Sequence, residues 1–148
     1  MSEKKPIKVL LVDDDSSIRT VLAKLLERHH ISVVVLATVE EAIDTLESDP
    51  EINQLLVDFN LSQKRSGREV ALAALKIRPE LSCIFMSGDH TLTLAEIDIE
   101  GSDLILKPFL TDELIERFKK FHSGSKSPQA ASRKKSKKMP DRQGRLDL

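Results

Sequence analysis

The sequence contains no tryptophan and no tyrosine, and only 3% of its 148 residues are aromatic. Proteins that bind single-stranded nucleic acids stack bases on aromatic rings, so this composition argues against that class. The single cysteine, Cys83, excludes a disulfide within the chain and a zinc site built from several cysteines. Because Cys83 stands inside an apolar run, we expect a small core residue.

Long apolar runs are also missing. No stretch approaches the roughly 20 residues that a membrane span requires. The apolar stretch near the N-terminus is too short for a signal peptide and ends in three acids, Asp13, Asp14 and Asp15. We therefore expect a cytoplasmic protein with no membrane span.

The chain does carry an uneven charge distribution behind its formal net charge of −1. Residues 1–122 contain 15 Lys and Arg against 22 Asp and Glu, whereas residues 123–148 contain 8 Lys and Arg against 2 Asp. We expect an acidic globular domain over 1–122 and a basic, disordered tail over 123–148. The run RKKSKK at 133–138 suits contact with nucleic acid, an anionic membrane, an acidic partner or the acidic domain itself, or it is a passive extension.

The first 122 residues alternate short apolar runs with helical periodicity. The apolar runs predict five strands, at 7–12, 31–36, 54–57, 81–86 and 103–106. Periodicity and capping patterns predict helices at 16–29, 38–49, 66–79 and about 112–121. This alternation predicts an α/β fold with a parallel sheet, right-handed crossovers and helices on both faces.

The segment between the fourth and fifth strands is poorly patterned for a helix. Its apolar residues lie in two pairs, Leu92 with Leu94 and Ile97 with Ile99, rather than along a helical stripe. The threonines at 91 and 93 are poor helix formers. We expect a fourth helix that is short, distorted or absent.

Polar residues stand at or just after the carboxyl ends of these strands, namely Asp13, Asp14, Asp58, Ser87 and Lys107. Doubly wound folds place their sites beyond these ends, so the residues are expected to cluster. Carboxylates about 4 Å apart repel by roughly 4 kcal/mol per pair at an effective dielectric constant of 20. The cluster therefore needs positive charge, from Lys107 and from a hard divalent cation, for which Mg²⁺ fits an open site with few protein ligands.

Such a cluster suits phosphoryl chemistry. An aspartate beside a divalent cation can act as a nucleophile toward a phosphoryl group. Lys107 would neutralise the phosphoryl oxygens, and the Ser87 hydroxyl could donate a hydrogen bond to one of them.

Four short motifs in this order resemble the receiver domain of two-component response regulators, over roughly residues 6–121. They are VDDD at 12–15, Asp58, MSG at 86–88 and KPF at 107–109. No motif is specific alone, but their order and spacing together are. The resemblance implies a flavodoxin-like, three-layer, doubly wound sheet of five parallel strands in the order 2-1-3-4-5.

The resemblance also implies a role for each acidic residue. Asp58 would be the phosphoacceptor, receiving a phosphoryl group from a sensor histidine kinase or a phosphotransfer protein. Asp13, Asp14 and Asp58 would hold Mg²⁺ together with the backbone carbonyl of Asn60. The protein would then be a signalling switch that binds a downstream protein, and not an enzyme.

Further roles follow from the same resemblance. Ser87 matches the switch hydroxyl, and Lys107 would pair with the phosphoryl oxygens. The Lys107–Pro108 bond would be cis, as X-Pro bonds can be at low cost. Asn60 and Asp89 occupy the two positions that tune self-dephosphorylation in this family.

The chain departs from the family pattern in three places. Leu104 stands at the aromatic switch position, so the usual ring rotation cannot occur. The loop after Asp58 lacks the usual proline and is longer, and the fourth-helix region is shorter. These departures motivate an alternative, a receiver-shaped scaffold that acts by protein contacts with little dependence on phosphorylation.

A hydrolase with an aspartyl-phosphate intermediate is a third hypothesis. Asp13, Asp15, Ser87 and a later lysine faintly resemble the haloacid-dehalogenase phosphatases. That family needs another acidic pair after the lysine strand and a cap domain, and the chain offers only Asp112 and Glu113 at a helix start.

Ordinary structural roles are the remaining alternatives for these residues. The three consecutive acids suit a helix N-terminus, and we assign Asp15 to capping alone. Asp58 and Ser87 could be turn residues and Lys107 a surface lysine. We interpret His90, near the predicted site, as a solvated loop histidine.

Overall fold

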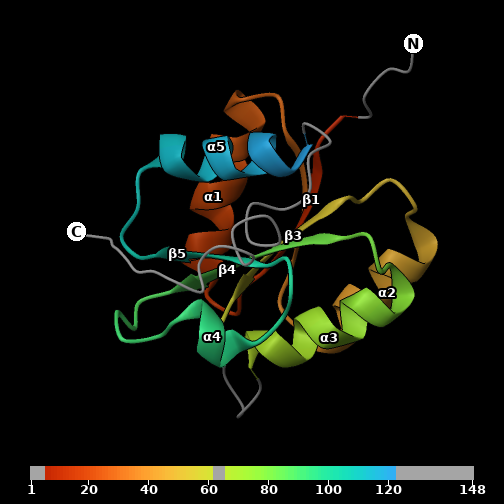
Figure 1. Ribbon diagram of the computed structural model, residues 1–148. Helices are drawn as coiled ribbons and strands as arrows, with labels where there is room; N and C mark the ends of the chain where they lie inside the picture. Colours follow the sequence, from red (N-terminus) through yellow and green to blue (C-terminus); the bar gives the residue numbers. More distant parts are fainter. Residues whose placement is uncertain (1–5, 62–65, 123–148) are drawn as a thin grey trace.

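The computed structural model describes residues 6–61 and 66–122 (Figure 1). Strands and helices alternate strictly along these residues. They are β1 (Lys8–Val12), α1 (Ser16–Arg28), β2 (Ser32–Leu36), α2 (Val39–Ser48), β3 (Gln54–Asp58), α3 (Gly67–Ile77), β4 (Ser82–Ser87), α4 (Leu94–Ile97), β5 (Asp103–Leu106) and α5 (Thr111–His122). The predicted basic tail over 123–148 lies outside the described residues and stays a prediction.

The five strands form one parallel sheet in the order β2-β1-β3-β4-β5. This order confirms the predicted 2-1-3-4-5 arrangement. The registers pair Val12 with Val57, and Asp58 with Met86. Because all strands run the same way, their carboxyl ends share one edge of the sheet, and the residues that follow them are brought together there.

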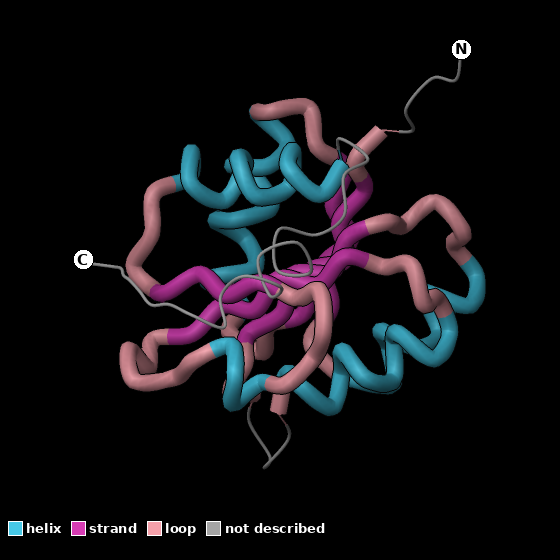
Figure 2. The backbone as a smooth tube through the Cα atoms, in the orientation of Figure 1, coloured by secondary structure: helices cyan, strands magenta, loops and turns pink. Residues whose placement is uncertain are grey.

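Helices cover both faces of the sheet, with α1 and α5 on one face and α2, α3 and α4 on the other (Figures 1 and 2). Side chains along β1 alternate between the two faces of the sheet, so this strand contributes to the core on both faces. Val9 and Leu11 pack in the core cluster with α1 and α5, whereas Leu10 and Val12 pack in the cluster with α2 and α3. All four side chains are fully buried, which explains why the strand has a continuous apolar run.

The helix starts follow the predicted capping patterns. Asp15 caps α1, where its carboxylate accepts hydrogen bonds from two backbone N–H groups of the first turn. Thr38 and Glu41 form the predicted reciprocal capping box of α2. The Ser66 hydroxyl caps α3 by accepting a hydrogen bond from the Glu69 N–H. These caps satisfy backbone donors that have no partner inside the helix.

The fourth helix is a single turn, Leu94–Ile97, which confirms the prediction of a short element. Thr93 caps its start, and Asp98 ends it in the left-handed conformation with φ 55°. The buried Ile97 holds the turn against the sheet. The Arg68 Nε also donates to the Ile97 carbonyl at 2.6 Å, so α3 fixes the end of α4.

The fourth strand extends one residue beyond the predicted boundary and includes Ser87. This residue pairs with Leu106 in the sheet, and its carbonyl accepts a hydrogen bond from the Lys107 N–H at 2.7 Å. Cys83 is buried in this strand, as expected of a core residue. None of the helices over 6–61 and 66–122 is long and apolar enough to cross a membrane.

Candidate functional site

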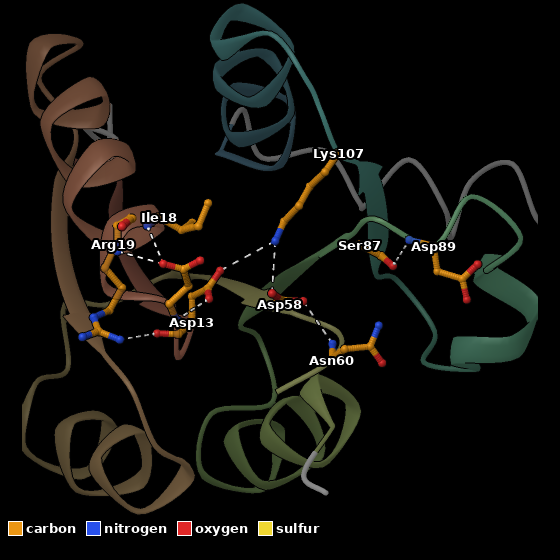
Figure 3. Close-up of polar contacts among 10 residues, drawn as sticks. Asp13, Ile18, Arg19, Asp58, Asn60, Ser87, Asp89 and Lys107 are labelled. Atoms are coloured by element: carbon orange, nitrogen blue, oxygen red, sulfur yellow. Dashed lines mark hydrogen bonds and ion pairs between the residues drawn. The ribbon is translucent and has the colours of Figure 1, made fainter. Parts of the chain in front are cut away.

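The predicted polar residues converge at the carboxyl edge of the sheet (Figure 3). Asp13 directly follows β1, Asp58 ends β3, Ser87 ends β4 and Lys107 directly follows β5. Each element contributes one side chain, so the site depends on the strand order rather than on any local motif.

Lys107 links two of the acids. Its ammonium Nζ lies 3.1 Å from Asp58 Oδ2 and 3.9 Å from Asp13 Oδ2. The Asp13 side chain has no exposed surface, whereas 14% of the Asp58 side chain and 28% of the Lys107 side chain are exposed. The pair that meets solvent is therefore Asp58 and Lys107, with Asp13 behind them.

Asp13 is held in an unfavourable environment for a carboxylate. Its Oδ1 accepts a hydrogen bond from the Asp15 N–H at 2.9 Å, but its buried Oδ2 has no hydrogen-bond partner in the described structure. Burial raises the pKa of Asp13 to about 6, and the neighbouring Asp58 and Asp14 carboxylates act in the same direction. The Asp15 N–H and Lys107 oppose this rise without cancelling it.

These features fit a divalent cation. The buried Oδ2 of Asp13 accepts no hydrogen bond from the described residues, and the Asp58 carboxylate lies next to it around the Lys107 ammonium. Asp14 is exposed at the same edge of the sheet. No three His, Cys, Asp or Glu side chains in the described ranges are arranged to hold a metal by themselves. A site with few side-chain ligands suits Mg²⁺, which usually keeps several waters.

The Asp58 carboxylate is restrained at both oxygens. Oδ2 contacts Lys107, and Oδ1 accepts a hydrogen bond from the Asn60 N–H at 3.0 Å. Gly67, at the start of α3, packs directly on the backbone of Asp58 and Phe59, and its N–H donates to the Phe59 carbonyl. The α3 terminus therefore fixes the position from which Asp58 faces solvent. The predicted role of the Asn60 carbonyl as a metal ligand stays a prediction.

Ser87 is fully buried, and its hydroxyl is engaged by the loop that follows β4. Its Oγ accepts a hydrogen bond from the Asp89 N–H at 2.9 Å (Figure 3). The Asp89 carboxylate accepts hydrogen bonds from the Thr91 hydroxyl and N–H, which hold the pKa of Asp89 below its usual range. Here the serine hydroxyl is turned toward the backbone of its own loop.

The backbone of Lys107 is held on both sides. The Lys107–Pro108 bond is cis, as the resemblance implied. The Lys107 N–H donates to the Ser87 carbonyl, and the Lys107 carbonyl lies 2.7 Å from His90 Nε2. A carbonyl can only accept, so the imidazole nitrogen is the donor. His90 is exposed, as expected of a loop histidine, but its contact with Lys107 was not predicted from the sequence.

An apolar cavity of about 450 Å³ lies beside Lys107. It is lined by residues of α1, β4 and the loop before α5, namely Ile18, Val21, Leu22, Met86, Lys107, Pro108 and Phe109. Val21 is 55% exposed although it is a large apolar residue. The lysine that faces Asp58 thus also borders an apolar surface accessible from solvent.

Asp103, the first residue of β5, forms an ion pair with Arg117 that the sequence did not suggest. Arg117 of α5 donates to Asp103 Oδ2 at 3.0 Å and to the Leu104 carbonyl at 3.1 Å. Leu104 itself is partly buried against the core cluster with α2 and α3. The residue at the aromatic switch position is therefore a packed aliphatic side chain whose backbone α5 holds.

Comparisons with known proteins point to one family. The response regulator receiver domain family matches residues 9–119. Among curated relatives, the sensory transduction protein LytT of Bacillus cereus is 31% identical over 82% of this chain and 49% of its own length. The transcriptional regulatory protein CpxR of Escherichia coli is 32% identical over 76% of this chain and 47% of its own length. The chain thus spans about half the length of these relatives.

Solved structures agree on the fold. A receiver protein from Sinorhizobium medicae superposes with a TM-score of 0.73 at 24% identity, over 81% of this chain and 97% of that chain. A CheY-like receiver domain protein from Methanospirillum hungatei gives a TM-score of 0.69 at 26% identity, over 80% and 94%.

Proposed function

The chain belongs to the response regulator receiver family, and we propose that its Asp58 accepts a phosphoryl group from a phosphohistidine donor. The observation that carries this proposal is the placement of a partly exposed Asp58 carboxylate 3.1 Å from Lys107. A reactive carboxylate must reach solvent, and the charge of the incoming phosphoryl group needs a fixed cation beside it.

The proposed step exchanges one bond for another. A carboxylate oxygen of Asp58 attacks the phosphorus atom, and the bond from phosphorus to the leaving group breaks. With a histidine donor the leaving imidazole nitrogen keeps the electron pair and takes up a proton, and with an acyl phosphate the leaving group is the carboxylate. Lys107 neutralises the oxygens of the transferred group, and the Ser87 hydroxyl becomes a donor to one of them if it leaves the Asp89 N–H.

Asp13, Asp14, Asp58 and the Asn60 carbonyl are the proposed ligands of Mg²⁺. When bound, the ion would neutralise charge on the phosphoryl oxygens that Lys107 alone leaves unbalanced. Asp13 supports this assignment, because its buried Oδ2 accepts no hydrogen bond within the described part of the chain and the Lys107 ammonium 3.9 Å away still leaves the pKa of this carboxyl raised to about 6.

The proposed partners follow from the chemistry. The donor is a sensor histidine kinase or a phosphotransfer protein, encountered in the cytoplasm. Its phosphohistidine must come next to Lys107, and the apolar cavity that borders Lys107 provides a surface against which the donor protein can pack. Phosphorylation would then change the binding of a downstream protein, because the added charge shifts the conformational equilibrium of the loops that hold Ser87 and Lys107.

Incubation with Mg²⁺ and a small acyl phosphate, followed by intact-mass measurement, tests the proposal. We expect the wild type to gain the mass of one phosphoryl group, and Asp58→Asn to gain none. A wild type that gains nothing, or an Asp58→Asn variant that gains as much, would overturn the assignment. The receiver-shaped scaffold is not favoured, because a partly exposed carboxylate beside a lysine and a buried acid suits phosphoryl transfer, whereas docking of a partner protein alone does not require it.

A further inference from the structure

We propose that His90 is a positioning residue for Lys107, an inference that rests on the proposed function of Asp58. His90 lies in the loop between β4 and α4, and its Nε2 donates to the Lys107 carbonyl at 2.7 Å across 17 residues of sequence. Lys107 in turn carries the ammonium that contacts Asp58. The imidazole thus holds the backbone from which the phosphoryl-pairing side chain extends.

The contact completes a clamp on Lys107. The backbone N–H on one side of the residue donates to the Ser87 carbonyl of β4, and the carbonyl on the other side accepts from His90. Both partners belong to the strand and loop that also carry the Ser87 hydroxyl. Backbone and side-chain hydrogen bonds therefore connect Lys107 to Ser87, and these are the two residues whose side chains would hold a phosphoryl group.

The loop that presents His90 is itself ordered by local hydrogen bonds. The Asp89 carboxylate accepts from the Thr91 N–H at 2.9 Å and from the Thr91 hydroxyl at 2.6 Å. The Leu92 N–H donates to the Asp89 carbonyl at 3.1 Å. This turn fixes the backbone on both sides of His90, so the contact with Lys107 costs little further backbone entropy.

The charges around His90 are compatible with donation. The Asp89 carboxylate neighbours His90 in the chain, and the Lys107 ammonium is directed toward Asp58 (Figure 3). Both the imidazolium and the neutral ring with its proton on Nε2 donate from this nitrogen. The clamp therefore does not require one particular charge state.

Two substitutions separate the hydrogen bond from the bulk of the ring. His90→Phe keeps an aromatic ring and removes the donor, whereas His90→Gln keeps a side-chain N–H near the position of Nε2. We expect His90→Phe to lower the rate of Asp58 phosphorylation by an acyl phosphate about fivefold, the factor that one neutral hydrogen bond supplies. His90→Gln should restore most of this rate, and His29→Phe, at the distant end of α1, should not change it.

Binding measurements distinguish positioning of Lys107 from a general structural effect. Beryllofluoride, a phosphoryl analogue, would contact Lys107, so His90→Phe should weaken its binding by a similar factor. The affinity for Mg²⁺ alone should stay unchanged, since the proposed metal ligands do not touch His90. Equal loss of both affinities would contradict the inference.

The outcomes also separate this inference from the proposed function. Scalar coupling between His90 Nε2 and the Lys107 carbonyl carbon, measured by NMR, reports the hydrogen bond without any phosphorylation, and its absence would overturn the inference. If the wild type is phosphorylated on Asp58 and His90→Phe behaves like it, only the positioning role fails. If the wild type is not phosphorylated, the proposed function fails, and the role of His90 fails with it.

Discussion

The ammonium of Lys107 lies 3.1 Å from the carboxylate of Asp58, although 49 residues separate them in the sequence. Each stands at the carboxyl end of a strand, and β4 lies between the two strands. This cation, which also approaches the buried Asp13, holds together a cluster that mutual repulsion would otherwise disfavour. Several consequences of this arrangement can be measured.

Replacing Lys107 by methionine should impair phosphorylation more than it impairs folding. The variant keeps an aliphatic side chain of similar length but removes the charge beside Asp58. We expect the rate of acyl-phosphate labelling to fall by about 100-fold, the usual scale for the loss of one preorganised electrostatic contact. Intact mass against time measures this rate. Lys119→Met, on α5, is the matched control, and an equal loss there would contradict the role of Lys107.

Asp13→Asn should stabilise the metal-free protein at neutral pH. Burial raises the pKa of Asp13 from 3.8 to about 6 in the folded state, so its protonated form is favoured by folding. The contribution is complete below pH 3.8 and is lost as the pH rises through 6. Asparagine stays neutral, so its advantage over the wild type should grow as the pH rises from 3.8 to 6 and level off above pH 6 at about 3 kcal/mol in the free energy of unfolding.

Urea unfolding in a chelator at pH 4 and pH 8 measures this difference. Asp44→Asn, at an exposed position on α2, is the control. Mg²⁺ should raise the stability of the wild type and have little effect on Asp13→Asn. Equal stability of the wild type and Asp13→Asn at pH 8 would contradict the unfavourable burial of Asp13.

Gly67→Ala should destabilise the fold and disturb the phosphoacceptor. A Cβ at this position would lie 2.9 Å from the Phe59 Cα and closer still to the Asp58 carbonyl oxygen, both of them backbone atoms. Relief requires α3 to move away from the end of β3, at a cost of about 1–3 kcal/mol. Urea unfolding measures this loss. Gly88→Ala is the matched control because its Cβ would meet no atom within 4 Å, and comparable losses would refute the close-packing argument.

Val21→Glu should impair transfer from a protein donor without impairing the chemistry at Asp58. Val21 lines the cavity beside Lys107 and is 55% exposed, so a carboxylate there disrupts an apolar contact surface but leaves the site intact. We expect transfer from a phosphorylated histidine kinase to fall by about tenfold, while acyl-phosphate labelling stays within about twofold of the wild type. Leu72→Glu, an exposed position on α3 in the opposite layer, is the control.

The secondary structure was largely predictable because each element carries its own periodicity. Apolar runs marked the five strands within one or two residues, and Thr38 with Glu41 marked the start of α2. The boundary of β4 was missed by one residue, since Ser87 belongs to the strand only through its pairing with β5. Pairing between distant segments leaves no local pattern in the sequence.

The sequence by itself determined the order of elements, the buried strands, the weak helical pattern before β5 and the identity of the acids and the lysine at the strand ends. These properties follow from hydrophobic periodicity and from the chirality of parallel crossovers. Only the tertiary structure decided that Asp13 has a buried oxygen without a hydrogen-bond donor among the described residues and that His90 donates to Lys107. Both depend on how side chains and loops from separate elements pack, because burial and hydrogen bonding are properties of neighbours in space rather than neighbours in the chain.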